Sequence, residues 1–175
     1  LGDIAPIHNP VEAEYIEIIR RILPDTDQYA IFDSAFFKDV PEVNSIYGIP
    51  YELTKKFTIR RYGEHGINHG FITQQAEEIL GNDKAKLVTL HLGSGASVAA
   101  EKDGKCYDTS MGFTPMNGLV MGTRSGDVDP ALVPFFMKKM GASADEVIDM
   151  FNKRSGLLGV SGVSSDMRDL EDSDD

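Results

Sequence analysis

The stretch from residue 86 to residue 109 limits the fold of this chain more than any other part of the sequence. Lys86–Leu92 is rich in β-branched and apolar residues, and Gly93-Ser94-Gly95 interrupts it. Ala96–Glu101 then alternates as a strand does, Asp103-Gly104 is a hairpin turn signal, and Lys105–Thr109 continues in β-type sequence. The stretch therefore predicts three strands joined by two tight turns.

Helical patterns surround this strand region. In residues 11–23, apolar side chains recur with helical spacing between Pro10 and Pro24. Further helices are predicted at residues 50–57, 68–80, 130–140 and 143–154. The last of them has Ser143 as its N-cap and Glu146 as the capping-box partner.

The remaining segments are predicted to be a strand and two loops. Tyr29–Phe32 is a short apolar strand that ends at Asp33, while residues 112–126 and 155–165 are loops rich in glycine. Hairpins combined with helices indicate an α/β or α+β class with a mixed sheet.

Composition restricts the partners of the chain. The net charge is −11 and the pI is about 4.7, which argues against nucleic acid or an anionic membrane as the main partner. A phosphate site needs only a few local donors, so an acidic chain can still bind phosphate. The single cysteine, Cys106, fits a reducing compartment and a structural role in its strand.

The two ends of the sequence carry an expectation of their own. The chain starts at Leu1-Gly2-Asp3 without a basic, apolar leader, and it ends in an acidic tail. No apolar run approaches the roughly 18–20 residues that cross a bilayer. We expect the chain to be a piece of a longer enzyme.

The glycine turn after the first strand is a candidate anion site. In the segment His91, Leu92, Gly93, Ser94 and Gly95, consecutive backbone N–H groups of a tight turn can cradle phosphate oxygens, and glycine allows close approach. The alternative is a plain hairpin turn. The chain contains neither a G-x-G-x-x-G fingerprint nor a P-loop, so a phosphate site here requires another architecture.

Arg124 is a second candidate. It lies between Gly and Ser residues in a loop, where a guanidinium can clamp phosphate or carboxylate in a bidentate manner. The alternative is a solvated loop in which Asp129 caps the helix that Pro130 starts.

Three further polar residues are candidates with competing structural interpretations. His65 can donate a hydrogen bond to a phosphoryl group during its transfer. Together with His69, four residues later, it can also be half of a metal site, although no third ligand is evident. Asp33, at the end of a strand, can orient a nucleophile or simply cap a following helix.

The segment Ser161–Arg168 has two interpretations as well. Asp166 can accept hydrogen bonds from a ribose while the Arg168 guanidinium stacks on a base. The same residues are typical of a capped helix start.

Taken in order, these motifs resemble the acetate kinase family, of the acetate and sugar kinase/heat-shock/actin superfamily. The matching stretches are APIHNP at 5–10, IFDSAF at 31–36, GIPYEL at 48–53, IRRYGEHGINH at 59–69, HLGSGASV at 91–98, DTSMGFTPMNGLVMGTRSGDVDP at 108–130 and SGLLGVSGVSSDMRD at 155–169. The resemblance implies an actin-like (ribonuclease H-like) α/β fold with a mixed sheet and flanking helices. Residues 1–37 would end a first domain and residues 38–175 would begin a second.

The resemblance also implies an activity: reversible transfer of the γ-phosphoryl group of ATP to acetate, giving acetyl phosphate and ADP, with Mg²⁺, in a cytoplasmic homodimer. The site residues that it implies fall into three groups. The catalytic group is Asp33, His65 and Arg124. The nucleotide contacts are His91, Leu92, Gly93, Ser94, Gly95, Asp166, Met167 and Arg168. The substrate contacts are Ile7, His8 and Pro115.

Several features depart from the family pattern. Glu64 stands where members usually have Phe, and a carboxylate there repels acetate unless it is paired or turned away. Ser94 stands where many members have Asn. The family's metal-binding Asn and Glu and its substrate-clamping Arg have no counterpart here, so the Mg²⁺ ligands are expected outside this chain. Propionate or butyrate kinase activity, and a truncated homologue that binds nucleotide without turnover, remain alternatives.

Overall fold

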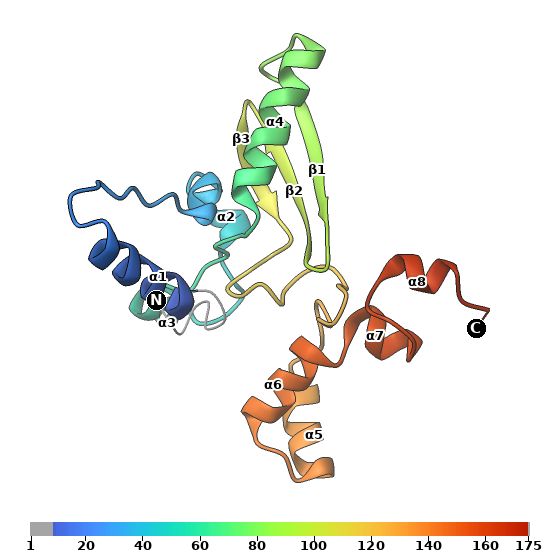
Figure 1. Ribbon diagram of the computed structural model, residues 1–175. Helices are drawn as coiled ribbons and strands as arrows, with labels where there is room; N and C mark the ends of the chain where they lie inside the picture. The colour runs from blue at the N-terminus through green and yellow to red at the C-terminus, as the bar shows by residue number, and fades with distance from the viewer. Residues whose placement is uncertain (1–8, 175) are drawn as a thin grey trace.

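A computed structural model describes residues 9–174 of the chain (Figure 1). A small sheet lies at one end of the molecule and a group of short helices at the other. The elements are α1 (Asn9–Ile22), η1 (Asp33–Phe37, a 3-10 helix), α2 (Glu42–Ser45), α3 (Tyr51–Phe57), α4 (Gly66–Leu80), β1 (Lys86–Leu92), β2 (Ala96–Lys102), β3 (Lys105–Thr109), α5 (Leu132–Met140), α6 (Ala144–Lys153), α7 (Gly156–Ser161) and α8 (Met167–Glu171).

The three strands form an antiparallel sheet in the order β1-β2-β3, which confirms the predicted double hairpin. The second turn places Asp103 and Gly104 at φ 54° and 69°, the left-handed values that this dipeptide tolerates in a tight hairpin. The register between β2 and β3 shifts at Ala100 and Glu101, which is a β-bulge. Every strand pair within residues 9–174 is antiparallel.

Helix α4 covers one face of the sheet (Figure 1). Beneath it lies a core cluster of buried residues: Phe37, Val40, Ala99 and Cys106. A second cluster lies where the loop after β3 meets the start of β2, and consists of Ala96, Met111 and Met121 with Leu119 against them. The second cluster therefore anchors the loop that carries Arg124 to the glycine turn.

The sheet face away from α4 retains exposed apolar side chains. On β1, Val88, Leu90 and Leu92 are 64%, 57% and 71% exposed, whereas Thr89, on the opposite face, is buried. Because successive side chains of a strand point to opposite faces, α4 covers only one of the two apolar faces of this strand. No helix within the described residues is long and apolar enough to cross a membrane.

The predicted strand at Tyr29–Phe32 is wrong. These residues are extended but unpaired, with Tyr29 and Ile31 more than 80% exposed, and η1 follows them directly. Strand propensity alone was insufficient, because a strand also needs a neighbouring backbone and the described part of the chain places none beside this segment.

The predicted loop at residues 155–165 is also partly wrong, because it contains helix α7. The helix starts at Gly156, whose φ of 64° and close approach to the Met121 carbonyl exclude a side chain there. The N–H of Leu157 donates to the Met121 carbonyl at 2.8 Å, and that of Leu158 to the Gly122 carbonyl at 3.0 Å. Tertiary hydrogen bonds therefore start a helix that its Gly/Ser/Val sequence does not favour.

The helices predicted at residues 143–154 and 68–80 are confirmed as α6 and α4, with shifted ends. Ser143 and Glu146 form the expected capping box at the start of α6. Helix α4 begins two residues earlier than predicted, at Gly66, because a side chain from another element caps it, as described below.

Candidate active site

The glycine turn between β1 and β2 is open to solvent and lies against the loop that carries Arg124. The N–H of Gly93 donates to the Gly95 carbonyl at 3.0 Å, and the N–H of Gly122 donates to the Ser94 carbonyl at 3.0 Å. A Cβ atom placed on Gly95 would lie 3.5 Å from Nη1 of Arg124 and 3.6 Å from Nε2 of His65. The turn therefore meets both predicted phosphoryl contacts at one point.

Arg124 is held in place by its own loop. Its Nη1 donates to the Pro115 carbonyl at 3.2 Å, and its carbonyl accepts from the N–H of Met121 at 3.0 Å. The side chain is half-buried. The predicted acetate-pocket residue Pro115 thus contacts the predicted phosphoryl-binding arginine, as a carboxylate site beside a phosphoryl site requires.

His65 stands at the N-cap position of α4 with φ of 64°. The left-handed conformation costs a non-glycine residue roughly 1–2 kcal/mol, so the surrounding contacts must hold it. The His65 ring stacks on that of His91, with centroids 3.8 Å apart and planes 11° apart. Its Nδ1 lies 2.8 Å from Oγ of Ser97, which leaves Nε2 as the ring nitrogen nearest Gly95.

Asp33 lies close to His65 in space through the start of α4. Its Oδ1 accepts from the N–H of Ile67 at 2.9 Å, and its backbone carbonyl would be 2.0 Å from a Cβ on Gly66. Asp33 therefore caps α4, a different helix from the one that follows it in sequence. The N–H that it accepts from belongs to Ile67, two residues after the N-cap His65, so Asp33 contacts the same end of α4 that carries His65.

Glu64 is half-buried among these groups. Burial raises the pKa of its carboxyl group, the negative charges of Asp33 and Glu12 raise it further, and the positive charge of Arg124 opposes them. The residue is therefore within the field of both Asp33 and Arg124, and it carries an unfavourable negative charge when ionised.

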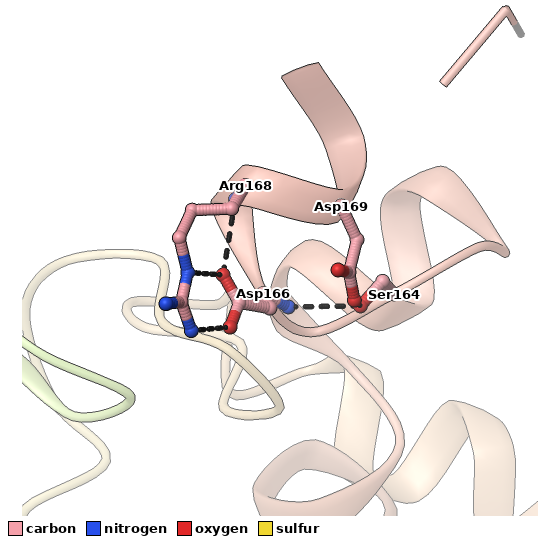
Figure 2. A network of polar contacts seen from close by, with 4 residues as sticks. All are labelled: Ser164, Asp166, Arg168 and Asp169. Atoms are coloured by element: carbon pink, nitrogen blue, oxygen red, sulfur yellow. Dashed lines mark hydrogen bonds and ion pairs between the residues drawn. The ribbon is translucent and has the colours of Figure 1, made fainter. Parts of the chain in front are cut away.

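Figure 2 shows the predicted adenosine segment as a capped helix start. Asp166 caps α8: its Oδ1 accepts from the N–H of Arg168 at 3.0 Å, and its Oδ2 pairs with Nη2 of Arg168 at 2.5 Å. The N–H of Asp166 donates to Oγ of Ser164, which in turn donates to Asp169 at 2.6 Å. The structural alternative for this segment is thus confirmed, and it is compatible with ligand contacts because the Arg168 side chain is 86% exposed.

The pKa of Asp166 is lowered to about 2, mainly by the hydrogen bonds from Arg168. The segment also lies beside the phosphoryl loop. A Cβ on Gly122 would lie 2.9 Å from the Ser165 carbonyl. The structure therefore brings the glycine turn, the arginine loop and Ser165, the residue just before Asp166–Arg168, close together.

His69 does not pair with His65 as a metal site. It is fully buried, and both ring nitrogens contact hydroxyl groups: Nδ1 lies 2.6 Å from Oγ1 of Thr89 and Nε2 lies 2.8 Å from Oγ of Ser97. Burial lowers the pKa of His69 to about 4, and the electrostatic influence of His65 and His91 acts in the same direction, so His69 is neutral at physiological pH.

Sequence reasoning missed Ser97, Thr89 and Glu101 as parts of the site. Oγ1 of Thr89 is hydrogen-bonded to Oε1 of Glu101 at 2.5 Å, and Glu101 is 3% exposed. A carboxylate on the buried face of an alternating strand was the available signal, because ionisable groups are rarely buried without a partner.

Two predicted substrate contacts, Ile7 and His8, lie outside the described residues. Within residues 9–174, no three His, Cys, Asp or Glu side chains come together as a possible metal site.

Comparison with known proteins identifies this arrangement. Among solved structures, the propionate kinase of Francisella tularensis matches with a TM-score of 0.92 and 47% identity, over 95% of this chain and 43% of that one. The acetate kinase of Porphyromonas gingivalis matches with a TM-score of 0.88 and 48% identity, over 95% of this chain and 42% of that one. The described fold is accordingly an actin-like α/β fold of the kind found in acetate and propionate kinases.

The sequence carries the assignment one level further. The chain is 51% identical over 174 residues to the acetate kinase of Anoxybacillus flavithermus, which is 98% of this chain and 44% of that protein. The Acetokinase family model matches residues 1–175. The chain belongs to the acetokinase family, and it spans less than half the length of the relatives that it matches.

Proposed function

We propose that this chain supplies the phosphoryl-transfer part of a kinase that moves the γ-phosphoryl group of ATP to acetate and back. One observation carries the proposal: Arg124 and His65, from different elements, converge at Gly95 in the glycine turn. A guanidinium and an imidazole N–H at one end of a backbone turn are suited to a phosphoryl group, whose transfer depends mainly on positioning and charge neutralisation.

The proposed reaction is an in-line displacement. A carboxylate oxygen of acetate attacks the γ-phosphorus, the bond from that phosphorus to the β,γ-bridging oxygen breaks, and ADP leaves with the bond electrons. Arg124 and Nε2 of His65 donate to the equatorial oxygens of the group in transfer, while amides of the segment His91–Gly95 hold the nucleotide phosphates. Asp33 orients the reacting groups from the start of α4.

The two ends of the substrates have separate proposed contacts. Asp166, Met167 and Arg168 bind the adenosine, with the exposed Arg168 guanidinium stacking on the base. Pro115 forms a wall for the acetate methyl group together with Ile7 and His8. The contact between Pro115 and Arg124 supports this placement, because it puts the methyl wall next to the phosphoryl site.

Mg²⁺, a homodimer, a cytoplasmic location and a domain boundary at residue 37 belong to the same proposal. The resemblance to acetate kinases supports all four, and the Mg²⁺ ligands are proposed to lie outside this chain. The exposed apolar residues of β1 support a further protein layer on that face of the sheet.

Propionate is the second candidate acceptor, because the Francisella tularensis structure that matches with TM-score 0.92 is named a propionate kinase. One methylene changes binding in an apolar pocket by only about 1–3 kcal/mol, so the same site can serve both acids. The ratio of kcat/KM for acetate, propionate and butyrate distinguishes them.

A chimera tests the proposal. This chain replaces the matching segment of the Anoxybacillus flavithermus acetate kinase, and acetyl phosphate formation is followed with ATP and acetate. We expect the chimera to be active and the 175-residue chain assayed alone to form no detectable product, because it spans 44% of that relative. An inactive but folded, ATP-binding chimera would support the non-catalytic alternative.

Glu64 gives a prediction on substrate affinity. Its ionised carboxylate repels acetate, so Glu64→Gln in the chimera should lower KM for acetate about fivefold at neutral pH, which corresponds to about 1 kcal/mol. Because the pKa of Glu64 is raised, lowering the pH protonates it, and the KM of the parent chimera should fall as the pH decreases toward that pKa. Glu52→Gln, on the exposed surface of α3, is the control, and an equal KM shift in both variants would contradict the prediction.

A further inference from the structure

Five polar side chains form a continuous hydrogen-bonded chain from the site into the core, which we call the buried relay: His65, Ser97, His69, Thr89 and Glu101. Successive distances along it are 2.8, 2.8, 2.6 and 2.5 Å. The three inner members are 0–6% exposed, and Glu101 is 3% exposed. The relay thus joins the proposed phosphoryl contact to a carboxyl group with almost no access to water.

Strand geometry explains why these residues meet. Ser97 and Glu101 are four residues apart on β2, so their side chains point to the same face. Thr89 of β1 lies opposite Ala99, between them, and α4 covers this face with His69.

When every member donates one hydrogen bond along the relay, the relay has two possible directions. A hydroxyl has one proton to donate, and a neutral imidazole has one N–H and one acceptor nitrogen. If Glu101 is protonated on Oε1, each member donates toward the site, so the proton of His69 is on Nε2 and Nδ1 of His65 accepts from Ser97. If Glu101 is ionised, each bond reverses, so the proton of His69 is on Nδ1 and His65 donates from its own Nδ1.

We propose that Glu101 is a positioning residue, which acts through the buried relay to set which ring nitrogen of His65 carries a proton. With the relay directed toward the site, a neutral His65 presents an Nε2–H donor at Gly95, which is the donor that phosphoryl transfer requires. With the relay reversed, neutral His65 presents a lone pair there. The consequence for chemistry rests on the proposed function, whereas the direction of the relay does not.

The pKa of Glu101 determines the pH at which the direction of the relay reverses. Burial raises the pKa of Glu101 to about 7, while its hydrogen bond with Thr89 acts in the opposite direction. Its Oε2 is buried with no hydrogen-bond partner, which makes ionisation costly. His69, with a pKa of about 4, stays neutral throughout and transmits the change.

The titratable groups around the relay come from all the elements packed on it. His91 of β1 and Asp33 of η1 act on the pKa of His69 in opposite directions. Cys106 of β3 is paired opposite Glu101, and burial raises its pKa to about 12, so the thiol is neutral. The other charged groups on these strands and on α4 lie outside the relay: Glu77 is half-buried near Gly104, and the rest are exposed, namely Glu78, Lys86, Lys102, Lys105 and Asp108.

The test reads the tautomers directly. The chain contains four histidines, so ¹⁵N-histidine NMR of the 175-residue protein can assign Nδ1 and Nε2 of His69 as protonated or unprotonated across a pH series. We expect the proton of His69 to move from Nε2 to Nδ1 as the pH rises through about 7. A His69 tautomer that stays constant through this range in the unmodified protein would overturn the proposal.

Variants assign the step to Glu101. Glu101→Gln removes the ionisation and should abolish the pH dependence, and Glu101→Leu should leave the proton of His69 on Nε2 at every pH because Thr89 can then donate only to Nδ1. Thr89→Val, which interrupts the relay but keeps Glu101 ionisable, should also abolish the step. Glu77→Gln, a neighbouring carboxyl outside the relay, should keep it. A step that persists in Glu101→Gln would refute the assignment.

The pH dependence of kcat tests whether the state of Glu101 affects phosphoryl transfer. In the active chimera, kcat should show an inflection near pH 7 that is absent in Glu101→Gln, while at each pH the KM for acetate should be the same in the two proteins. A His69 tautomer step without any difference between the two kcat profiles would refute the link to His65 while leaving the phosphoryl-transfer proposal intact. Loss of activity in the parent chimera, by contrast, would refute the proposed function and leave the NMR result standing.

Discussion

Arg124→Ala in the chimera should lower kcat for acetyl phosphate formation by about 10³-fold or more, the range by which a single arginine accelerates phosphoryl transfer. The guanidinium sits beside Gly95, where Nε2 of His65 also lies. Arg124→Lys should recover only part of the rate, because an ammonium retains the charge but lacks the planar fork. Steady-state kinetics with saturating ATP measures both variants.

The matched control is Arg154→Ala, whose side chain is exposed at the end of α6. It should retain kcat within about twofold, since surface substitutions have small effects on the fold. Because Arg124 also bonds to the Pro115 carbonyl, thermal unfolding of the Arg124 variants must be compared as well. A folded Arg124→Ala protein with nearly unchanged kcat would remove the main support for the proposed function.

Phe37→Ala should destabilise the chain by about 3–5 kcal/mol, a large share of the roughly 5–15 kcal/mol that stabilises a typical domain. Phe37 is 1% exposed and packs edge-on against Phe36 and His69, with ring centroids at 5.5 and 6.2 Å. The backbone of Gly63 approaches the ring so closely that a Cβ there would lie 2.5 Å from it. Removing the ring leaves a cavity that this tight packing cannot refill.

Urea unfolding followed by circular dichroism measures the change in the free energy of unfolding. Phe57→Ala is the control, because Phe57 is 58% exposed and should change the stability by no more than about 0.5 kcal/mol. Similar losses for both variants would show that Phe37 is not in the core of the folded state. The His65–Ser97 contact should also loosen in Phe37→Ala, because the Phe37 ring packs against His69, which is hydrogen-bonded to Ser97.

Local patterns were sufficient where neighbouring residues decide the structure. The three strands of the double hairpin follow from alternation and from Asp103-Gly104, and the capping box of α6 follows from Ser143 and Glu146 alone. The prediction failed at Tyr29–Phe32, where strand propensity found no partner strand. It failed also at Gly156–Ser161, where hydrogen bonds to the residue 121–122 backbone start a helix.

For the candidate site, the motifs pointed to individual residues but not to the structural contacts that these residues make. Asp33 was expected at a strand end and instead caps α4, a helix that begins more than thirty residues later. His69 was considered as half of a metal site and instead lies in the core between two hydroxyl groups. The catalytic, nucleotide and substrate roles assigned to the site residues, and the boundary at residue 37, stay predictions.

The amino-acid order alone was enough to indicate the family, the double hairpin, and the residues His65, Arg124 and His91–Gly95, because each is contained in a contiguous motif. Only the tertiary structure revealed that Arg124 and His65 meet at Gly95, and that Glu101 connects to His65 through the core. The physical reason is the same in both cases. Convergence and burial depend on how α4 packs on the sheet, and the direction of a proton chain depends on contacts between residues far apart in sequence.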